Sequence, residues 1–271
     1  MSPLTVMLDL ADPAVAERHR VALATLPARL RIATGPGTDV VAVSGGDPDW
    51  PACVAAAISS GARGVLVAGP GPADVDAIRQ LHERASARGA AVALESPVFD
   101  ATWLAAVGSA RTAVPAASLV DGLLVTGRGL AAGLVEQLML IGSLAGALDD
   151  IRGGSAGLAG YWVSASLGGT PVNLAGVASR LGARLTLDVV SEHEQWAASF
   201  DRSGAARPTS VARYDEHGTQ LRPERHESAE RAVWRHLATA VTEGVPLPYT
   251  LGDLADHLEP LAQLCRSRSA I

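Results

Sequence analysis

The sequence predicts an α/β fold in two parts: a truncated domain on a parallel sheet, residues 1–97, and an α+β domain with a mainly antiparallel sheet, residues 98–271. Two observations carry this prediction. Short apolar strands alternate with helices as far as Pro97, which is typical of a doubly wound parallel sheet. After Pro97 apolar and polar residues alternate with a period of two, which favours antiparallel strands with one buried face.

Each element of the first domain is marked by its residues. The segment 4–10 is strand-like, and Asp12 and Pro13 are suited to the N-cap and the first position of the helix that follows. Further strands are expected at 28–33, 39–44, 64–69 and 90–96, with helices at 49–61 and 72–89. Ligands of such folds bind beyond the carboxyl ends of the strands, so the loops there are the first place to search for a site.

The second domain begins with a helical stretch and continues into alternating strands. The most apolar segment, 129–148, carries Glu136 near its centre, which favours a buried helix over a membrane span. The segment 184–190 places its leucines and valine on one face of a strand. Two helices are expected to close the chain, the last one opened by Thr250 with Asp253 three residues later in the manner of a capping box.

Composition narrows the possible partners. Apolar residues make up 48% of the chain, the net charge is -6 and the pI is near 5.6, so a nucleic acid or an anionic membrane is not expected as a partner. All 22 basic residues are arginines, and the chain contains no lysine. The first ten residues lack the pattern of a secretory signal, which predicts a cytoplasmic protein.

The order of these parts resembles the glucose-fructose oxidoreductase and inositol dehydrogenase (Gfo/Idh/MocA) family. The resemblance spans nearly the whole chain and is closest in residues 39–78, with further similarity in the ending 236–270. It implies a truncated Rossmann-like domain and hydride exchange between NAD(P) and a sugar-like or cyclitol-like alcohol. It also implies a glycine-rich turn for the pyrophosphate, a lysine in an E-K-P motif, and an aspartate and a histidine on a later helix.

The nucleotide-binding positions of that family are altered in this chain. The three glycines of its G-x-G-x-x-G turn correspond to Ala11, Pro13 and Ala16. Pro13 removes a backbone donor, and Asp12 places a carboxylate where the phosphate should bind. Where the second strand should end in an acidic residue for the ribose, the chain offers only Ala33 and Thr34.

The catalytic positions are altered as well. Ala68, Gly69 and Pro70 stand at the E-K-P motif, and no lysine elsewhere can replace the missing one. Glu136 aligns near the aspartate and histidine of the later helix, and Met139 aligns with its aspartate. Standard NAD(P) binding is therefore disfavoured, and the cofactor, if any, is unknown.

Two sets of residues are candidates for a site. Glu95, at the end of a strand, and Glu136 are candidate catalytic acids or bases, provided that they lie close together. A ligand cleft is possible where two strands end, although turn chemistry alone also explains its residues. The candidate cleft residues are Ser44, Gly45, Gly46, Asp47, Trp50, Gly69 and Pro70. No metal site is expected.

Three functions follow as hypotheses. The first is an oxidoreductase-like pseudoenzyme that has lost standard NAD(P)-dependent hydride transfer and acts as a non-catalytic binding or partner subunit. It would form a homo- or hetero-oligomer through the antiparallel sheet, and a small-molecule ligand is possible. The second is a repurposed enzyme with non-redox acid-base chemistry, such as a lyase, isomerase or cyclase. The third is a divergent NAD(P)-dependent oxidoreductase.

Overall fold

A computed structural model describes residues 2–33, 37–127, 129–151, 153–180, 183–201 and 209–269. The chain divides into two compact units. Unit 1 comprises Met1–Phe99 and Ser228–Ala255, and unit 2 comprises Asp100–Glu227 and Asp256–Ile271. The first boundary lies two residues beyond the predicted one. Ser228–Ala255, which was predicted to belong to the second domain, belongs instead to unit 1, because its helix α6 packs against α1 and the strands β4 and β5.

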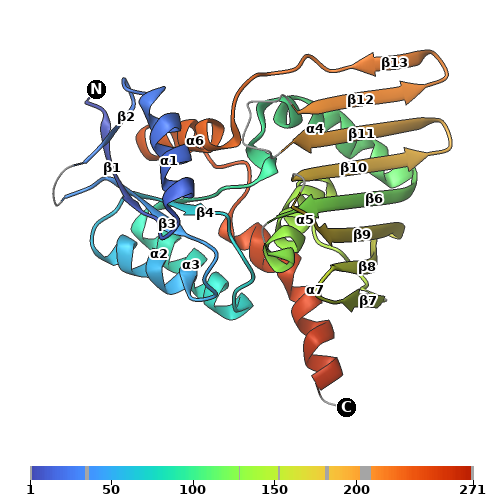
Figure 1. Ribbon diagram of the computed structural model, residues 1–271, viewed down its shortest axis with the longest axis horizontal. Helices are drawn as coiled ribbons and strands as arrows, with labels where there is room; N and C mark the ends of the chain where they lie inside the picture. The colour runs from blue at the N-terminus through green and yellow to red at the C-terminus, as the bar shows by residue number, and fades with distance from the viewer. Residues whose placement is uncertain are drawn as a thin grey trace. The chain divides into compact units, whose positions relative to one another are not determined.

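Unit 1 is built on a five-stranded parallel sheet in the order β2-β1-β3-β4-β5 (Figure 1). Its strands are β1 (Leu4–Asp9), β2 (Leu30–Ile32), β3 (Val40–Ser44), β4 (Gly64–Ala68) and β5 (Ala91–Leu94). Along the chain, β2 is added on one side of β1 and β3 to β5 are added on the other, so the order in which strands are added reverses between β1 and β3. This reversal is the topological switch point, where ligands of open α/β sheets bind.

Helices cover the parallel sheet of unit 1. They are α1 (Pro13–Ala24), α2 (Trp50–Ser59), α3 (Val75–Arg88), the short 3-10 helix η1 (Pro97–Phe99) and α6 (Ala229–Glu243). Right-handed crossovers place α1 on one face and α2 and α3 on the other, and α6 packs beside α1. Every residue of β4 is buried, as expected for a parallel strand covered on both faces.

Unit 2 is built on an eight-stranded sheet in the order β13-β12-β11-β10-β6-β9-β8-β7. β6 and β9 pair in parallel, and the other pairs are antiparallel. The strands are β6 (Ala117–Thr126), β7 (Gly153–Ala156), β8 (Gly160–Leu167), β9 (Thr170–Ala178), β10 (Arg184–Ser191), β11 (Glu194–Asp201), β12 (Ser210–Asp215) and β13 (Gly218–Leu221). The predicted combination of a Rossmann-like parallel domain with a mainly antiparallel second sheet is therefore confirmed.

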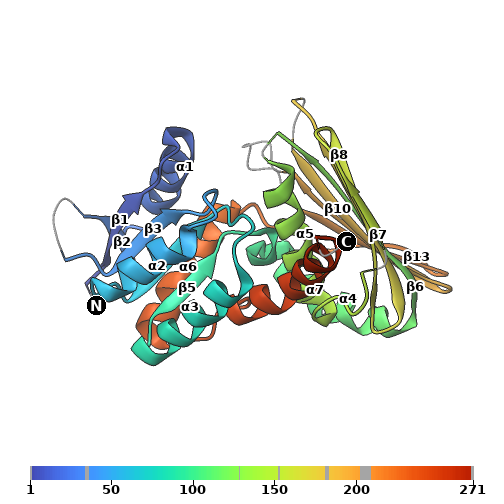
Figure 2. The same ribbon diagram turned by 90° about the horizontal axis from the view of Figure 1, so that it is seen from below.

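Two helices of unit 2, α4 (Ala101–Ala113) and α5 (Leu130–Ala145), lie on the same face of its sheet (Figure 2). A 3-10 helix, η2 (Val114–Ala116), follows α4. The last helix, α7 (Leu251–Ser269), opens with the predicted capping box, in which Thr250 N donates to Asp253 Oδ2 at 2.8 Å and Asp253 N donates to Thr250 Oγ1 at 3.2 Å. Among the described residues, no helix is both long and apolar enough to cross a membrane.

Candidate functional site

The switch point of unit 1 lies where β1 ends and α1 begins. The side chain of Asp12 accepts a hydrogen bond from Ala14 N at 2.8 Å, so it caps α1 as predicted. Pro13 follows at the first helical position and has no N–H to offer. The amide of Ala11 donates to Ser44 Oγ at 3.0 Å, across the reversal between β1 and β3. The backbone donors that a pyrophosphate uses at such a junction are thus missing at Pro13 and occupied at Ala11 and Ala14.

The same edge of the sheet carries exposed carboxylates. Asp9 is the last residue of β1, Asp12 caps α1, and Asp47 and Asp49 lie in the loop after β3. All four are exposed. Their negative charges oppose the approach of a phosphate, whereas a helix N-terminus by itself would attract one.

The candidate cleft residues after β3 and β4 pack against one another. Gly45 N donates to Ala68 O at 2.9 Å, and Gly71 N donates to Gly45 O at 2.8 Å. A Cβ on Gly45 would lie 2.7 Å from the Cα of Pro70, so only glycine allows the two loops to approach this closely. Gly69 adopts a left-handed conformation with φ of 60°. These contacts join the two loops into one close-packed corner.

The remaining cleft candidates separate into buried and open positions. The ring of Trp50 is fully buried, and its indole N–H donates to Gly71 O at 3.2 Å, so the ring presents no face to a ligand. Asp47 Oδ1 accepts from Asp49 N at 2.9 Å, which closes a turn. Gly46 has open space around it. A ligand role for Gly46 and Asp47 stays a prediction, and Thr34 lies outside the described residues.

Glu95 belongs to a buried polar network in unit 1. Glu95 is 1% exposed, and its Oε2 lies 3.7 Å from Nε2 of the fully buried His19. On the other side of the ring, the indole N–H of Trp234 donates to His19 Nδ1 at 3.1 Å. Because Nδ1 accepts this bond, Nε2 is the ring nitrogen left to face the carboxyl group of Glu95.

His19 and Trp234 were not among the residues predicted for a site. The helical period of α1 places His19 on the same face as Ala16, Ala22 and Leu23, all of which are buried. That pattern could have identified His19 as a buried histidine. No local pattern could have supplied Trp234, which lies 215 residues further along the chain.

Glu136 lies in unit 2, on α5, and is 7% exposed. Nearby, the hydroxyl of Tyr161 on β8 donates to Gln137 Oε1 at 2.6 Å, and Gln137 Nε2 donates to Ala175 O at 3.1 Å. Burial, with a further contribution from the charge of Glu136, raises the pKa of Tyr161 above its ordinary value. The phenol therefore stays protonated and acts as a donor.

The ring of Tyr161 lies against Gly176 on the neighbouring strand β9. Only glycine leaves room for the ring there, because a Cβ would overlap it. Met139, which the resemblance aligns with the family's aspartate, is fully buried and apolar. Glu95 and Glu136 belong to different units, and their proximity stays a prediction.

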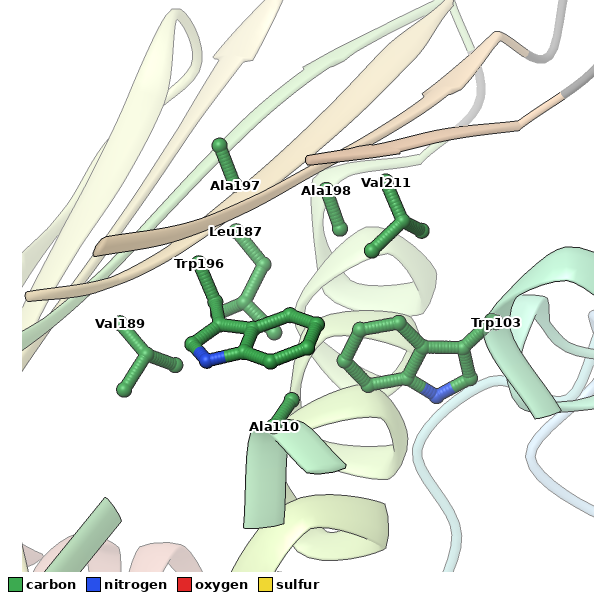
Figure 3. Close-up of a pocket in the computed structure, with 8 residues that line it drawn as sticks. All are labelled: Trp103, Ala110, Leu187, Val189, Trp196, Ala197, Ala198 and Val211. Atoms are coloured by element: carbon green, nitrogen blue, oxygen red, sulfur yellow. The ribbon is translucent and has the colours of Figure 1, made fainter. Parts of the chain in front are cut away.

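Unit 2 contains a small hollow between α4 and the sheet (Figure 3). Trp103 and Trp196 form two of its walls, and the lining is apolar. Trp103 directs its N–H to Ser143 Oγ at 3.1 Å. Such a lining offers no groups for acid-base chemistry. Its eight residues are Trp103, Ala110, Leu187, Val189, Trp196, Ala197, Ala198 and Val211.

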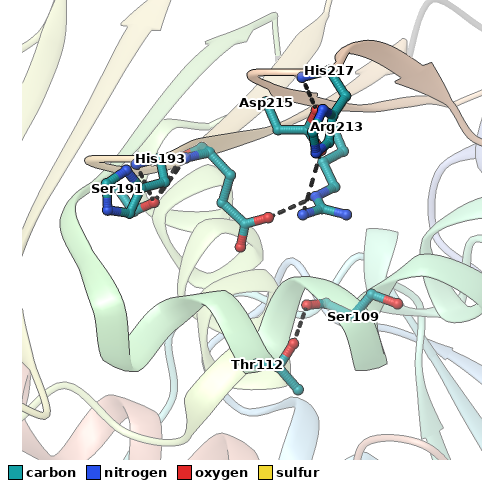
Figure 4. Close-up of polar contacts among 8 residues, drawn as sticks. Ser109, Thr112, Ser191, His193, Arg213, Asp215 and His217 are labelled. Atoms are coloured by element: carbon teal, nitrogen blue, oxygen red, sulfur yellow. Dashed lines mark hydrogen bonds and ion pairs between the residues drawn. The ribbon is translucent and has the colours of Figure 1, made fainter.

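Polar side chains gather at the hairpin ends of β10 to β13 (Figure 4). Arg213 Nε donates to Glu194 Oε2 at 2.6 Å, and Arg213 lies 3.4 Å from Asp215. Ser191 Oγ accepts from the amides of His193 and Glu194 and closes the turn between β10 and β11. Among the described residues, no group of three or more His, Cys, Asp or Glu side chains is arranged to hold a metal ion.

No family model and no curated protein matches the sequence. Solved structures do match the fold over nearly its full length. UDP-N-acetylglucosamine 3-dehydrogenase GnnA from Acidithiobacillus ferrooxidans is 15% identical, with 97% of each chain covered and a TM-score of 0.73. GenD2 from gentamicin A biosynthesis, in complex with NAD, is 18% identical, with 99% of this chain and 95% of that chain covered and a TM-score of 0.73.

A dehydrogenase from Chromobacterium violaceum is also similar, at 13% identity, with 98% of this chain and 96% of that chain covered and a TM-score of 0.72. At these sequence identities, the substrate or activity of a similar structure cannot be assigned to this chain. The match over nearly the whole of each chain, at TM-scores of 0.72 to 0.73, shows that the architecture is the same. The chain has the two-domain fold of the Gfo/Idh/MocA-type oxidoreductases.

Proposed function

We propose that this oxidoreductase-like protein does not perform standard NAD(P)-dependent hydride transfer and acts as a non-catalytic binding or partner subunit. The observation that carries the proposal is the occupied junction at the switch point. Asp12 caps α1 on Ala14 N, Pro13 lacks an N–H, and Ser44 takes the amide of Ala11. The lysine that the family uses at its E-K-P motif is missing from the entire sequence, which gives independent support.

The charges around this junction support the same proposal. A dinucleotide presents two phosphates, and the junction presents exposed carboxylates of Asp9, Asp12 and Asp47. In the dehydrogenase fold this position normally offers free amides at a positively polarised helix end. Both the hydrogen-bonding pattern and the sign of the charge are therefore reversed.

The proposal is tested by titrating the full chain with NAD+, NADH, NADP+ and NADPH, using calorimetry and tryptophan fluorescence. We expect no binding at micromolar nucleotide. GenD2, whose structure contains NAD, provides the positive control. Micromolar binding by this chain would instead support a divergent NAD(P)-dependent oxidoreductase and would overturn the proposal.

A repurposed acid-base enzyme is a second candidate, favoured by the network of Glu95, His19 and Trp234. The His19 ring, held by the hydrogen bond from Trp234, directs its Nε2 toward the carboxyl group of Glu95, and such contacts can orient an acid-base group. The substrates to try are sugar-like and cyclitol-like alcohols, with lyase, isomerase or cyclase products as the readout. Turnover that Glu95→Gln removes while the fold stays intact would support this candidate over the first.

The partner role requires a surface, and the sheet of unit 2 offers one. α4 and α5 lie on one face of this sheet, and the opposite face presents Leu123, Trp162 and Val177 with 40%, 48% and 46% of their surfaces exposed. Large apolar side chains gathered on one face are typical of an interaction surface. We propose this face as the site of homo- or hetero-oligomer formation.

A further inference from the structure

The face of the unit 2 sheet that α4 covers holds an indole without an acceptor. Trp196 on β11 is 4% exposed, and its buried Nε1–H has no hydrogen-bond partner among the described residues. The other indole at the hollow differs, because the N–H of Trp103 donates to Ser143 Oγ at 3.1 Å. A buried donor without an acceptor destabilises the folded protein, since it has given up its bond to water. An acceptor supplied by a bound ligand would remove this cost at Trp196.

Arg222 brings a positive charge to this indole. Its guanidinium carbon lies 5.1 Å from the centre of the Trp196 ring. Its Nε is also buried, and within the described part of the chain it too has no hydrogen-bond partner. The backbone amide of Arg222 donates to the carbonyl oxygen of Val211 at 2.8 Å. Because Val211 and Trp196 both line the hollow, the cation lies next to two of its walls.

The acidic side chains of this region are already paired with a different arginine. Glu194 lies two residues from Trp196 on the same face of β11, and its Oε2 accepts from Arg213 Nε at 2.6 Å (Figure 4). Arg213 also lies 3.4 Å from Asp215. Among the ion pairs of the residues that the structure describes, none involves Arg222. Its half-buried charge therefore favours an anion from outside the chain.

The hollow beside the two donors is apolar. Figure 3 shows the six-membered ring of Trp196 turned toward the ring of Trp103, with Ala110 beside them. All eight lining residues are apolar, so the hollow suits methyl and methylene groups. A sugar or a nucleotide is a poor fit, because its hydroxyl groups would be buried there without partners.

We infer that Trp196 and Arg222 bind the carboxylate of a small aliphatic acid, whose hydrocarbon tail occupies the hollow. An ionised carboxylate has two oxygens that only accept hydrogen bonds, each at about 2.9 Å from its donor. One oxygen takes the indole N–H of Trp196, and the other takes Nε–H of Arg222. Both buried donors then have an acceptor, and the charge of Arg222 is neutralised.

This carboxylate site goes beyond the proposed partner role and does not depend on it. Its residues all belong to unit 2, and none of them lies at the switch point of unit 1. A negative result with the carboxylate would leave the nucleotide titration unaffected, and nucleotide binding would leave the carboxylate result unaffected.

The test is a titration of the isotope-labelled full chain with sodium propionate, followed by the NMR signals of the indole N–H groups at constant ionic strength. Trp196→Phe, which removes the N–H and keeps a ring, identifies the signal of Trp196. We expect that signal to shift and to saturate at millimolar propionate. Propionamide has the same shape without the charge and should leave the signal in place. Formate has no tail and should bind more weakly than propionate.

Two arginine variants test the cation. Arg222→Met keeps most of the length of the side chain and removes the charge, and it should weaken propionate binding at least about tenfold. Arg225→Met is the matched control. Arg225 is exposed, and it contacts Thr102 through its backbone amide, so this variant should bind propionate like the wild type. Circular dichroism and thermal melting establish that each variant is folded.

Three results would each overturn the inference. The first is a Trp196 signal that propionate moves no further than sodium chloride does. The second is propionamide that binds as tightly as propionate, and the third is an Arg222→Met variant with unchanged affinity. The third result is decisive even if Trp196→Phe does not fold. Formate that binds as tightly as propionate would overturn the role of the hollow.

Discussion

The two sheets of this protein are covered in different ways. The parallel sheet of unit 1 has helices on both faces, so β4 is buried at every position, and ligands of such sheets bind at the loops of the carboxyl edge. The sheet of unit 2 has α4 and α5 on one face, and its other face alternates exposed and partly exposed residues. Unit 1 therefore leaves only the edges of its sheet uncovered, whereas unit 2 leaves a whole sheet face uncovered by α4 and α5.

The largest effect is expected from the buried polar network of unit 1. Replacing His19 by Leu leaves the indole N–H of Trp234 without its acceptor and removes the ring that faces Glu95. The free energy of unfolding should fall by about 2–4 kcal/mol. Chemical denaturation measures it. His217→Leu, in an exposed turn, is the control and should change the stability by less than about 0.5 kcal/mol. A small loss for His19→Leu would show that the network is not structural.

The next prediction compares two neighbouring residues of β9 whose side chains lie on opposite faces of the unit 2 sheet. Gly176→Val on the covered face of β9 collides with the ring of Tyr161 and should cost about 1–3 kcal/mol. Ala175→Val changes the neighbouring residue, on the face opposite α4 and α5, and adds two methyl groups, one carbon fewer than Gly176→Val, to a partly exposed position. Its effect on thermal or chemical unfolding should be within about 0.5 kcal/mol. Equal losses for the two variants would contradict the difference between the faces.

A smaller effect compares two strand-to-helix junctions of unit 1. Asp12 caps α1 at the switch point, and Asp74 caps α3, with each carboxylate accepting a backbone amide at 2.8 Å. Asp12→Ala and Asp74→Ala should each lower the free energy of unfolding by about 1 kcal/mol. Matched losses are expected because both are ordinary caps. If Asp12→Ala instead raised the free energy of unfolding, the Asp12 carboxylate would destabilise the folded protein, as expected of a residue that serves binding.

The smallest effect concerns Asp121 and Asp188, which lie across from each other on β6 and β10, on the sheet face opposite α4 and α5. The pKa of Asp121 is raised in the folded protein. The stability that its protonated carboxyl group contributes is therefore fully present below the unfolded pKa of about 3.8 and is lost as the pH rises through the folded pKa. Asp121→Asn should therefore be more stable than wild type at neutral pH, by about 0.2–1 kcal/mol, with no such gain in acid.

Denaturation from pH 3 to 8 measures this difference, at protein concentrations where the chain is monomeric. Because the charges are partly exposed, the gain should shrink as salt is added. A gain that persists in acid, or that does not respond to salt, would assign the effect to a cause other than charge repulsion.

Local sequence chemistry determined much of this fold. The alternation of strands and helices predicted the parallel sheet, and the period-two alternation of apolar and polar residues predicted the mainly antiparallel one. The capping residues Asp12 and Thr250 marked helix starts that the structure confirms. Such signals are readable because they depend on neighbours within about one helical turn. The absence of lysine and of the three glycines was likewise fixed by the sequence, whatever the fold.

Only the tertiary structure decided which distant residues meet. Ser44 reaches the amide of Ala11, Trp234 reaches His19, and α6 joins unit 1 rather than the second sheet. These contacts join residues separated by 33 to 215 positions, and their energies depend on packing and burial that no local pattern contains. The pairing of Asp121 with Asp188 also depends on strand register. A one-residue slip would send either side chain to the opposite face.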